Sequence, residues 1–536
     1  MNNNKNKDSF LKGALILGMA GIIVKIMGAF FRIPLGNLIG SKGMGYYQAV
    51  YPVYTLFLTL ATAGFPTALA KLVSEKNAIG DYKGVHKIFK ISYTVLFITG
   101  LVAFCIFFFG AKYIVQSMHN PDAYYAMLAI APALLFVPMM SSYRGYFQGK
   151  KEMTKIAISQ ISEQFFRVIL GLGLAYFLMN SYGSELGAAG AIAGATVGSI
   201  ASTIYLVTIY IGERKQRKAE KKASQHFKDE TVGRILKKLL VVAIPITIGA
   251  SVMPLVGMID SMIVIRRLTE AGFTSDQALS MFGQLTGMAM AIINLPSVIT
   301  IAMSMSLVPS ISESYAVGNK AKARKDTKSA IKVTLLMVLP AAFGIASLAT
   351  PIMSLLYPNE PSTVGTILFV LTPCVVFLGL MQTMNGVLQG MGKPMIPVIA
   401  LSIGMVFKII ISYTLTGIPE INVFGSALGT VTAYLVAALI EIVYVKKAMN
   451  IRFSPKEFII KPLISVITMF IAVKLSYALF AGIIGSKIAT VVAICVGAAV
   501  YGLVIIFIGG IRRDEVLTMP KGEKIYKLLK KFNLMR

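Results

Sequence analysis

Apolar runs of about 20 residues follow one another along almost the whole chain, and they restrict the fold more than any other feature. A helix rises about 1.5 Å per residue, so each run can cross roughly 30 Å of hydrocarbon. The runs are continuous rather than alternating, which excludes a β-barrel. Hydrophobic residues make up 56% of the 536 residues and charged residues only 14%. We therefore predict an all-α polytopic membrane protein with fourteen transmembrane helices, over residues 10–36, 46–70, 88–110, 122–143, 156–180, 187–211, 239–265, 284–311, 330–350, 363–385, 396–417, 424–445, 461–480 and 488–509.

Lysine and arginine are distributed unevenly between the predicted loops. Most of the 52 basic residues lie at the N-terminus, in alternate loops and in the C-terminal tail. Because basic loops stay on the cytoplasmic side, this pattern predicts a plasma-membrane protein with both termini in the cytoplasm. It also explains the net charge of +29 by topology and by attraction of the cytoplasmic loops to anionic lipid, with no nucleic acid as partner. The intervening loops contain only Lys42, Lys112, Arg266, Arg267 and Lys487.

The sequence also repeats itself once. The segment 74–80, SEKNAIG, returns as SESYAVG at 312–318, a separation of 238 residues, and 145–149, GYFQG, returns as GVLQG at 386–390. Each half contains six predicted helices, an even number, so both halves have the same orientation. Such a parallel repeat is typical of transporters that have a central site between the halves.

The repeat divides the chain into three predicted parts. Residues 1–235 form an N-terminal six-helix lobe with a cytoplasmic linker, and residues 236–450 form a C-terminal six-helix lobe. Residues 451–536 hold an additional helix pair and a basic amphipathic tail, in which apolar residues at helical spacing predict a helix on the inner membrane surface. The basic linker, 212–238, is either a gating element or a solvated surface helix near anionic lipid.

Several cations lie within predicted spans, where ionisable groups cost about 2.5–3.5 kcal/mol each and usually face a cavity. Lys25 and Arg32 are seven residues apart in the first span, nearly on one face. Arg167 lies in the fifth span, and Lys408, its repeat partner, lies in the eleventh. Arg32 is close enough to the outer end of its span to reach the headgroups instead.

Three further polar residues, Gln160, Glu163 and Gln164, precede Arg167 at spacings of three, four and seven, which places all four on one face of the fifth span. Glu163 and Arg167 are four residues apart and could form a structural ion pair. The main acid of the seventh span, Asp260, could pair with Lys408 or with the nearby Arg266.

A cavity lined mainly by cations favours an anion, and lipid-facing entrances favour an amphiphile. A phosphate-bearing lipid satisfies both, whereas cationic drugs would require acidic residues at the centre. An enzyme is not expected, because the three histidines, His86, His119 and His226, fall in predicted loops without metal-ligand spacing. No cofactor or metal is therefore predicted, apart from a possible coupling ion, Na⁺ or H⁺, or coupling to the membrane potential.

These residues resemble a known group of transporters. Two six-helix parallel halves plus two helices are similar to the multidrug/oligosaccharidyl-lipid/polysaccharide (MOP) exporter superfamily, and most to its branch of MurJ-type lipid II flippases, stage V sporulation protein B and polysaccharide-biosynthesis transporters. The similarity covers essentially the whole chain. It is carried by YTLFL at 54–58, GFP at 64–66, KLVSE at 71–75, RGYFQG at 144–149, and the polar residues 159–167.

The resemblance implies an alternating-access flippase in the bacterial plasma membrane, without catalytic residues. Its cargo would be a polyprenyl-pyrophosphate-linked saccharide such as lipid II, another lipid-linked polysaccharide, or a spore-cortex precursor. The headgroup would bind Lys25, Arg32, Arg167 and Lys408, and the last two helices would hold the polyprenyl tail. A monomer is expected. A drug/cation antiporter of the same superfamily is the other alternative.

The resemblance also bears on ion coupling. Family members with a sodium site use an acid in the seventh helix, which Asp260 could match, together with polar or acidic groups in the eleventh. Here the eleventh helix offers Lys408 and no acid. We hypothesise that the Lys408 ammonium group replaces a bound sodium ion.

Overall fold

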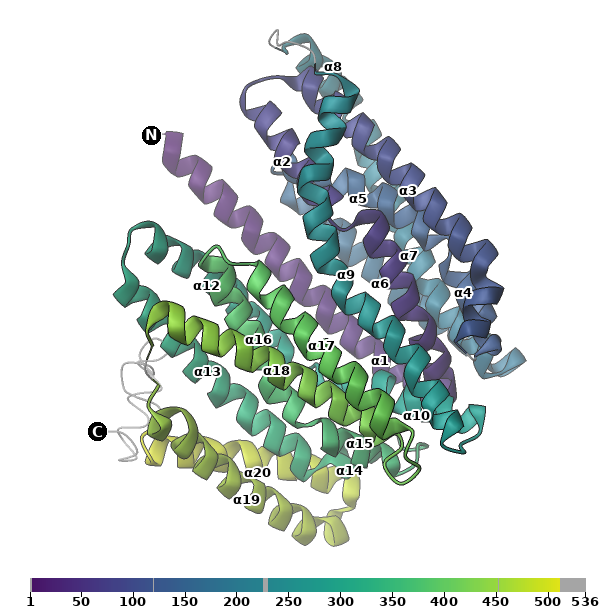
Figure 1. Ribbon diagram of the computed structural model, residues 1–536, viewed down its shortest axis with the longest axis vertical. Helices are drawn as coiled ribbons and strands as arrows, with labels where there is room; N and C mark the ends of the chain where they lie inside the picture. The colour runs from purple at the N-terminus through teal and green to yellow at the C-terminus, as the bar shows by residue number, and fades with distance from the viewer. Residues whose placement is uncertain (1, 119, 225–229, 452, 511–536) are drawn as a thin grey trace. The chain divides into compact units, whose positions relative to one another are not determined.

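The computed structural model describes residues 2–118, 120–224, 230–451 and 453–510, and within these ranges the chain forms helices and no β-strand (Figure 1). Twelve helices are long and apolar enough to span a membrane, or thirteen if one bent pair counts as a span. The chain is thus a polytopic helical membrane protein, as predicted, but the count of fourteen is not confirmed. The predicted tail helix, in 511–536, lies outside the described residues.

The difference in the count has a local cause. Two predicted spans, 10–36 and 46–70, overlap one apolar stretch, Ile16–Ala78, whose 63 residues are enough for two crossings at about 1.5 Å per residue. The stretch begins in α1, which is interrupted at Gly40, where φ is 66° and ψ 179°. A positive φ is readily adopted only by glycine, so the chain turns here and the two parts of α1 run in different directions (Figure 1).

The bent pair corresponds to another predicted span, 284–311. Its two parts, Ser275–Ile293 and Ser297–Ala316, meet at an angle of 54°. The break falls at Leu295 and Pro296, where the proline ring cannot continue the helix ladder.

Contacts divide the chain into two compact units. Unit 1 comprises 1–288 with 416–420, and unit 2 comprises 289–415 with 421–536. Packing places the main boundary between the units after residue 288, whereas the repeat predicts it at 235/236. The helices of unit 1 are α1 (Asn2–Thr62), α2 (Phe65–Ala78), α3 (Tyr82–Ser117), η1 (Pro121–Ala123), α4 (Tyr124–Ile130), α5 (Ala133–Gly149), α6 (Met153–Tyr182), α7 (Ser184–Gly212), α8 (Arg214–Lys222), α9 (Val232–Glu270) and α10 (Ser275–Gly283).

Unit 2 begins at the end of the π-helical turn η2 (Gln284–Ala289). Its last two long helices pair with each other and pack on α13 and α14. The helices of unit 2 are α11 (Met290–Ile293), α12 (Ser297–Ala316), α13 (Lys320–Ser347), α14 (Ala349–Leu356), α15 (Thr363–Leu371), α16 (Pro373–Gly390), α17 (Met395–Thr416), α18 (Val423–Met449), η3 (Lys456–Ile460), α19 (Lys461–Ile484) and α20 (Ser486–Phe507).

The internal repeat is visible in the packing of each unit. A Cβ atom added to Gly149 of α5 would lie 2.6 Å from Cβ of Val73 in α2. In unit 2, a Cβ atom added to Gly390 of α16 would lie 2.7 Å from Cβ of Ile311 in α12. The two glycines and their two neighbours are repeat-related in the sequence. The glycines in the repeated GxxxG-like segments therefore allow the same close helix approach in both units.

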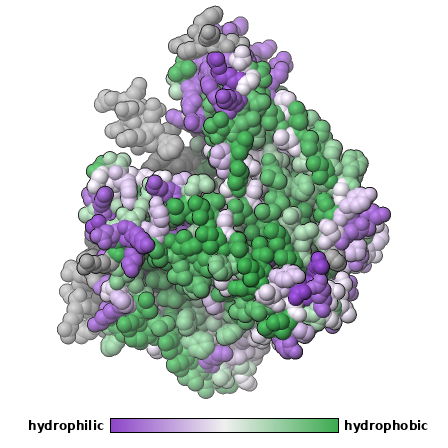
Figure 2. Space-filling model, viewed as in Figure 1, coloured by the Kyte–Doolittle hydropathy of each residue, from purple (hydrophilic) through white to green (hydrophobic). Residues whose placement is uncertain are grey.

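In the described part of the linker, 212–224 and 230–238, one short helix, α8, precedes the start of α9. Its Glu220 accepts a hydrogen bond from Lys150 at 2.7 Å, and the Arg217 guanidinium lies over the Tyr210 ring, 3.6 Å from its centroid. This agrees with a surface helix held against unit 1. On the face of unit 1 seen in Figure 2, hydrophilic residues gather around α8 and around α10, and hydrophobic residues cover the middle of α9 between them.

Candidate anion site in the N-terminal unit

The first part of α1 presents two predicted site residues to α6. Lys25, Gly28 and Arg32 are spaced by three and four residues, so they share one face of the helix. A Cβ atom added to Gly28 would lie 3.4 Å from Nε2 of Gln164 in α6. The structure therefore brings this face of α1 against the polar face of α6 predicted from the sequence. Lys25 is exposed and Arg32 half-buried.

Arg167 lies one turn further along α6, beside the second part of α1. Its Nη2 atom donates a hydrogen bond to Oη of Tyr51 at 3.3 Å, and the guanidinium is 5.6 Å from the centroid of the same ring. Tyr51 in turn stacks on Tyr47 at 5.6 Å and contacts Tyr54 at 5.9 Å. The Nε atom of Arg167 is buried and has no hydrogen-bond partner in the described residues.

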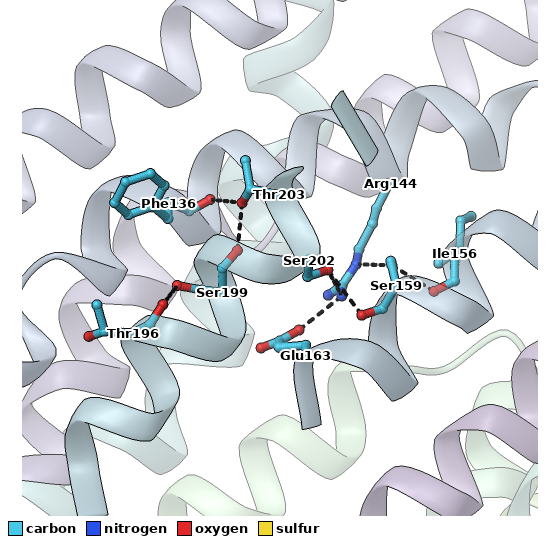
Figure 3. A network of polar contacts seen from close by, with 9 residues as sticks. All are labelled: Phe136, Arg144, Ile156, Ser159, Glu163, Thr196, Ser199, Ser202 and Thr203. Carbon is cyan, nitrogen blue, oxygen red and sulfur yellow. Dashed lines mark hydrogen bonds and ion pairs between the residues drawn. The ribbon is translucent and has the colours of Figure 1, made fainter. Parts of the chain in front are cut away.

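The carboxylate of Glu163 pairs with a residue of another helix rather than with Arg167. Arg144 of α5 donates from Nη2 to Oε2 of Glu163 at 2.9 Å, and from Nε to Oγ of Ser159 at 2.9 Å (Figure 3). Nη2 also reaches Oγ of Ser202 in α7 at 3.3 Å. One guanidinium thus joins α5, α6 and α7, which its planar fork of donors makes possible. The alternative of a Glu163–Arg167 ion pair is not found.

This arrangement leaves several cations of unit 1 without a counter-charge. Within the described residues, Lys25, Arg32 and Arg167 form no ion pair with a carboxylate. The single acid on the polar face of α6 is already neutralised by Arg144. The site can therefore attract an anion, and the tyrosine hydroxyl groups beside Arg167 add hydrogen-bonding capacity.

Glycines of α7 fix the position of α6. A Cβ atom added to Gly194 would lie 2.5 Å from the carbonyl oxygen of Arg167. Backbone contact of this kind holds α6 against α7, so the polar face of α6 is set by rigid packing. Gln160 and Glu163 are half-buried on this face, and Gln164 is buried.

The remaining predicted residues lie elsewhere. Lys408 is buried in α17 of unit 2, with 9% of its surface exposed, and Asp260 is buried in α9 of unit 1, with 8% exposed. Arg266 donates to Glu270 at 2.8 Å. The pairing of Asp260 with Lys408 or with Arg266 stays a prediction.

Within the part of the chain that the structure describes, no group of three or more His, Cys, Asp or Glu residues is placed so that it could hold a metal ion. The prediction that His86 lies in a loop is wrong, because it is buried inside α3, where it stacks on Tyr146 with centroids 6.1 Å apart. The helix begins at Tyr82, before the predicted span 88–110, and so includes His86. His119 and His226 lie outside the described residues.

Sequence reasoning missed two residues of this site. Arg144 belongs to a family-like segment but has no predicted role in the site, and Tyr51 is not among the predicted residues. Arg144 directly follows the predicted span 122–143 and precedes the repeated glycine segment. The positive-inside pattern by itself explains a basic residue at this position. The tyrosines at 47, 51 and 54 do follow helical spacing, and this spacing was the available signal.

Comparison with known proteins agrees with the fold. The family model described as polysaccharide biosynthesis protein matches residues 10–315, and the MatE model matches residues 245–414. Stage V sporulation protein B of Bacillus subtilis (strain 168) is 29% identical over 516 residues, covering 96% of this chain and 98% of that protein.

Two more relatives have names that mention lipid II. The lipid II flippase MurJ of Bacillus subtilis (strain 168) is 29% identical over 520 residues, covering 92% of this chain and 94% of that protein. A solved structure of the lipid II flippase MurJ in an inward closed conformation superposes with a TM-score of 0.70 at 17% identity, covering 91% of this chain and 98% of that one. The chain belongs to the polysaccharide biosynthesis protein family, in the flippase branch of the MOP superfamily of membrane transporters.

Proposed function

We propose that this protein is an alternating-access flippase that moves lipid II, a polyprenyl-pyrophosphate-linked saccharide, from the inner to the outer leaflet of the bacterial plasma membrane. It would work as a monomer with both termini in the cytoplasm. The pyrophosphate would bind the cations of unit 1, and the polyprenyl tail would stay in the bilayer. Such a transporter needs to bind and release its cargo, and no bond is made or broken.

One observation supports an anionic headgroup above others. Glu163 is held by Arg144, so it does not neutralise Arg167, and neither Lys25 nor Arg32 has a carboxylate partner in the described residues. Three cations without acids in one membrane unit are unfavourable unless an anion or water compensates them. A pyrophosphate group supplies the charge that the unit lacks.

Ion coupling is part of this proposal. Asp260 is the candidate for a coupling Na⁺ or H⁺, and the membrane potential can also act on charge movement. If the Lys408 ammonium group replaces a bound sodium ion, transport should be independent of sodium in the wild-type protein and become sodium-dependent in Lys408→Asn. Strict sodium dependence of the wild-type protein would contradict this replacement.

Two other functions have a specific observation in their favour. The stage V sporulation protein B relative is as similar as the MurJ relative, at 29% identity, which favours a cargo used in sporulation or another lipid-linked polysaccharide. The MatE match over 245–414 favours a drug/cation antiporter. Dye efflux from cells expressing the protein would identify the antiporter.

Complementation tests the main proposal. The chain is expressed in bacteria whose own lipid II flippase is switched off, and lipid II at the outer leaflet is quantified. We expect lipid II to appear outside with the wild-type protein. Because a hydrogen bond to a charged group contributes about 1.5–3 kcal/mol, Lys25→Ala or Arg167→Ala should reduce transport by roughly tenfold or more.

The control is Lys83→Ala, which removes an exposed lysine at the start of α3. It should express and transport like the wild type. Full transport by both Lys25→Ala and Arg167→Ala would contradict the cationic site. Lipid II that stays inside despite good expression would move the cargo to another polyprenyl-linked glycan.

A further inference from the structure

A cavity of about 550 Å³ lies between α2 and the start of α9, and none of Lys25, Arg32 and Arg167 lines it. From α2 it is lined by Lys71, Leu72 and Glu75. From α9 it is lined by Arg234, Lys237, Lys238, Val241 and Val242. Four of the eight lining residues are basic and one is acidic, so the cavity carries an excess of positive charge.

The basic residues of this cavity differ in whether they have an ion-pair or hydrogen-bond partner among the described residues. Lys238 donates to Glu230 at 2.6 Å, and Glu230 also pairs with Lys76 at 3.0 Å. By contrast, the side chains of Lys71, Arg234 and Lys237 form no ion pair or hydrogen bond with any described residue. All three are exposed at the surface of unit 1. They are therefore available for an anion that comes from outside the protein.

An apolar hollow of about 520 Å³ continues from this cavity along α9. The two share Lys237 and Val241, so they adjoin each other. Ile244 is 50% exposed and Val241 is 65% exposed. The apolar hollow is lined by Gly233, Leu236, Lys237, Leu240, Val241, Ile244 and Pro245, which follow one face of the helix.

We propose that these adjoining hollows bind one anionic phospholipid, with its phosphate between Lys71, Arg234 and Lys237 and an acyl chain along Leu240 and Ile244. A cationic pocket joined to an exposed apolar groove matches the two ends of such a lipid. The positive-inside pattern places this end of unit 1 in the inner leaflet, where anionic lipids attract basic residues. This site is separate from the proposed headgroup site of the cargo.

The lining residues favour a phospholipid over the saccharide cargo. None of the eight residues of the basic cavity is aromatic, so the cavity offers no ring face on which a sugar could stack. The three available cations, with Glu75 opposite, suit a small phosphate headgroup.

The chain contains no tryptophan, which makes a fluorescence test possible. Ile244→Trp places a single tryptophan in the apolar hollow. The full-length variant is reconstituted in nanodiscs of phosphatidylcholine with about one-tenth of a lipid brominated on its acyl chains, since bromine quenches tryptophan on contact. We expect brominated phosphatidylglycerol to quench several-fold more strongly than brominated phosphatidylcholine.

A matched pair of triple variants tests the phosphate site. On the Ile244→Trp background, K71Q/R234Q/K237Q removes the three proposed contacts, and K83Q/K90Q/K215Q removes three exposed lysines elsewhere in unit 1. Each basic residue near the surface contributes about 1 kcal/mol to anionic-lipid binding, or roughly fivefold. The first triple variant should therefore lose the several-fold preference for phosphatidylglycerol, so that the two brominated lipids quench it nearly equally, and the second should keep the preference.

Three outcomes would overturn the proposal. They are equal quenching by the two brominated lipids, equal loss in both triple variants, and relief of quenching by a polyprenyl pyrophosphate at a concentration well below that of the phospholipid. The last result would assign the site to the cargo. Quenching measures phospholipid binding alone. A negative result would therefore contradict this proposal without contradicting transport of lipid II.

Discussion

The pair α6–α7 in unit 1 and the pair α17–α18 in unit 2 are related by the internal repeat, and each contains one cation at the matching position. The helices approach in the same way. A Cβ atom added to Gly194 would lie 2.5 Å from the carbonyl oxygen of Arg167, and one added to Gly429 would lie 3.0 Å from that of Lys408. The repeat thus preserves the contact between glycine and backbone.

The polar groups around these contacts are not preserved. Arg144 joins α5, α6 and α7 through Glu163, Ser159 and Ser202 in unit 1. At the related positions, unit 2 has residues that cannot make this network: Asn385, Gly404, Ala400 and Ala437. Close packing therefore suffices to build the helix pair. In unit 1, the network also pairs Glu163 with Arg144, so Glu163 does not neutralise Arg167 on the same face of α6.

The largest effect in this comparison should come from Arg144→Met. It removes the partner of Glu163, whose side chain is only 23% exposed, and breaking a buried ion pair costs about 3–5 kcal/mol. Because this pair is partly exposed, we expect a loss of about 2–3 kcal/mol in the free energy of unfolding. The apparent melting temperature in detergent measures it.

The double variant Arg144→Met/Glu163→Met removes both charges and should recover much of that loss. In unit 2, Asn385→Met replaces the residue at the position related to Arg144, where Oδ1 has no hydrogen-bond partner in the described residues. It should change stability by less than about 1 kcal/mol. An equal loss in Arg144→Met and Asn385→Met would remove the distinction between the units.

An intermediate effect should come from the glycines that the two units share. In Gly194→Ala the new methyl group would meet backbone atoms of Arg167 and Gly171, at 2.5 Å and 2.6 Å, which cannot move without shifting α6. Overpacking of this kind costs about 1–3 kcal/mol. In Gly429→Ala the nearest atom, at 2.6 Å, is Oγ of Ser412, a side-chain atom that can rotate.

We therefore expect Gly194→Ala to lower the melting temperature more than Gly429→Ala does. The alanine also favours the helix by about 1 kcal/mol, so Gly429→Ala should be nearly neutral. In Gly429→Ala/Ser412→Ala the contact at 3.0 Å with the carbonyl oxygen of Lys408 remains, so this variant should be about as stable as the wild type. Destabilisation of both units to the same degree would show that the close approach is equally strict in each.

The sequence predicted most of the fold because hydrophobic length, loop charge and repeated glycines are local signals. Segments 145–149 and 386–390 identified the repeat, and the structure gives both the same packing role. The span count differs from the predicted fourteen for a physical reason. A helix can continue through a glycine kink such as Gly40, so loop and helix are not separated by hydropathy there.

The site was predictable only within one helix. Spacing placed Gln164 and Arg167 on one face, and the structure agrees. The same rule suggested Glu163 with Arg167, because residues four apart in a helix are neighbours. The actual partner, Arg144, lies on another helix, and its pairing depends on how α5 packs on α6 and α7. No periodicity in the sequence contains that information.

The smallest effect concerns the ion pairs of Glu230, a residue of the linker between the two halves. Glu230 accepts hydrogen bonds from Lys238 at 2.6 Å and also pairs with Lys76 at 3.0 Å, and these contacts hold the pKa of its carboxyl group below its usual value. A carboxyl group with a lowered pKa stabilises the folded state above its unfolded pKa of about 4.3, and this stabilisation disappears as the pH falls through the folded pKa. Near neutral pH it should amount to about 0.5–1 kcal/mol.

Glu230→Gln removes this carboxylate and keeps the shape of the side chain. Its melting temperature should be slightly below that of the wild type at pH 7, and the difference should shrink as the pH is lowered below about 4. Unit 2 gives the contrast at the end of α18. There Arg324 donates a hydrogen bond from Nε to the carbonyl oxygen of Met449 at 2.5 Å. This contact contains no acid that titrates. Arg324→Gln should therefore lower the melting temperature by an amount that does not vary with pH over the same range. A pH-dependent loss in Arg324→Gln would contradict the proposed difference between the Glu230 contacts and the Arg324 contact.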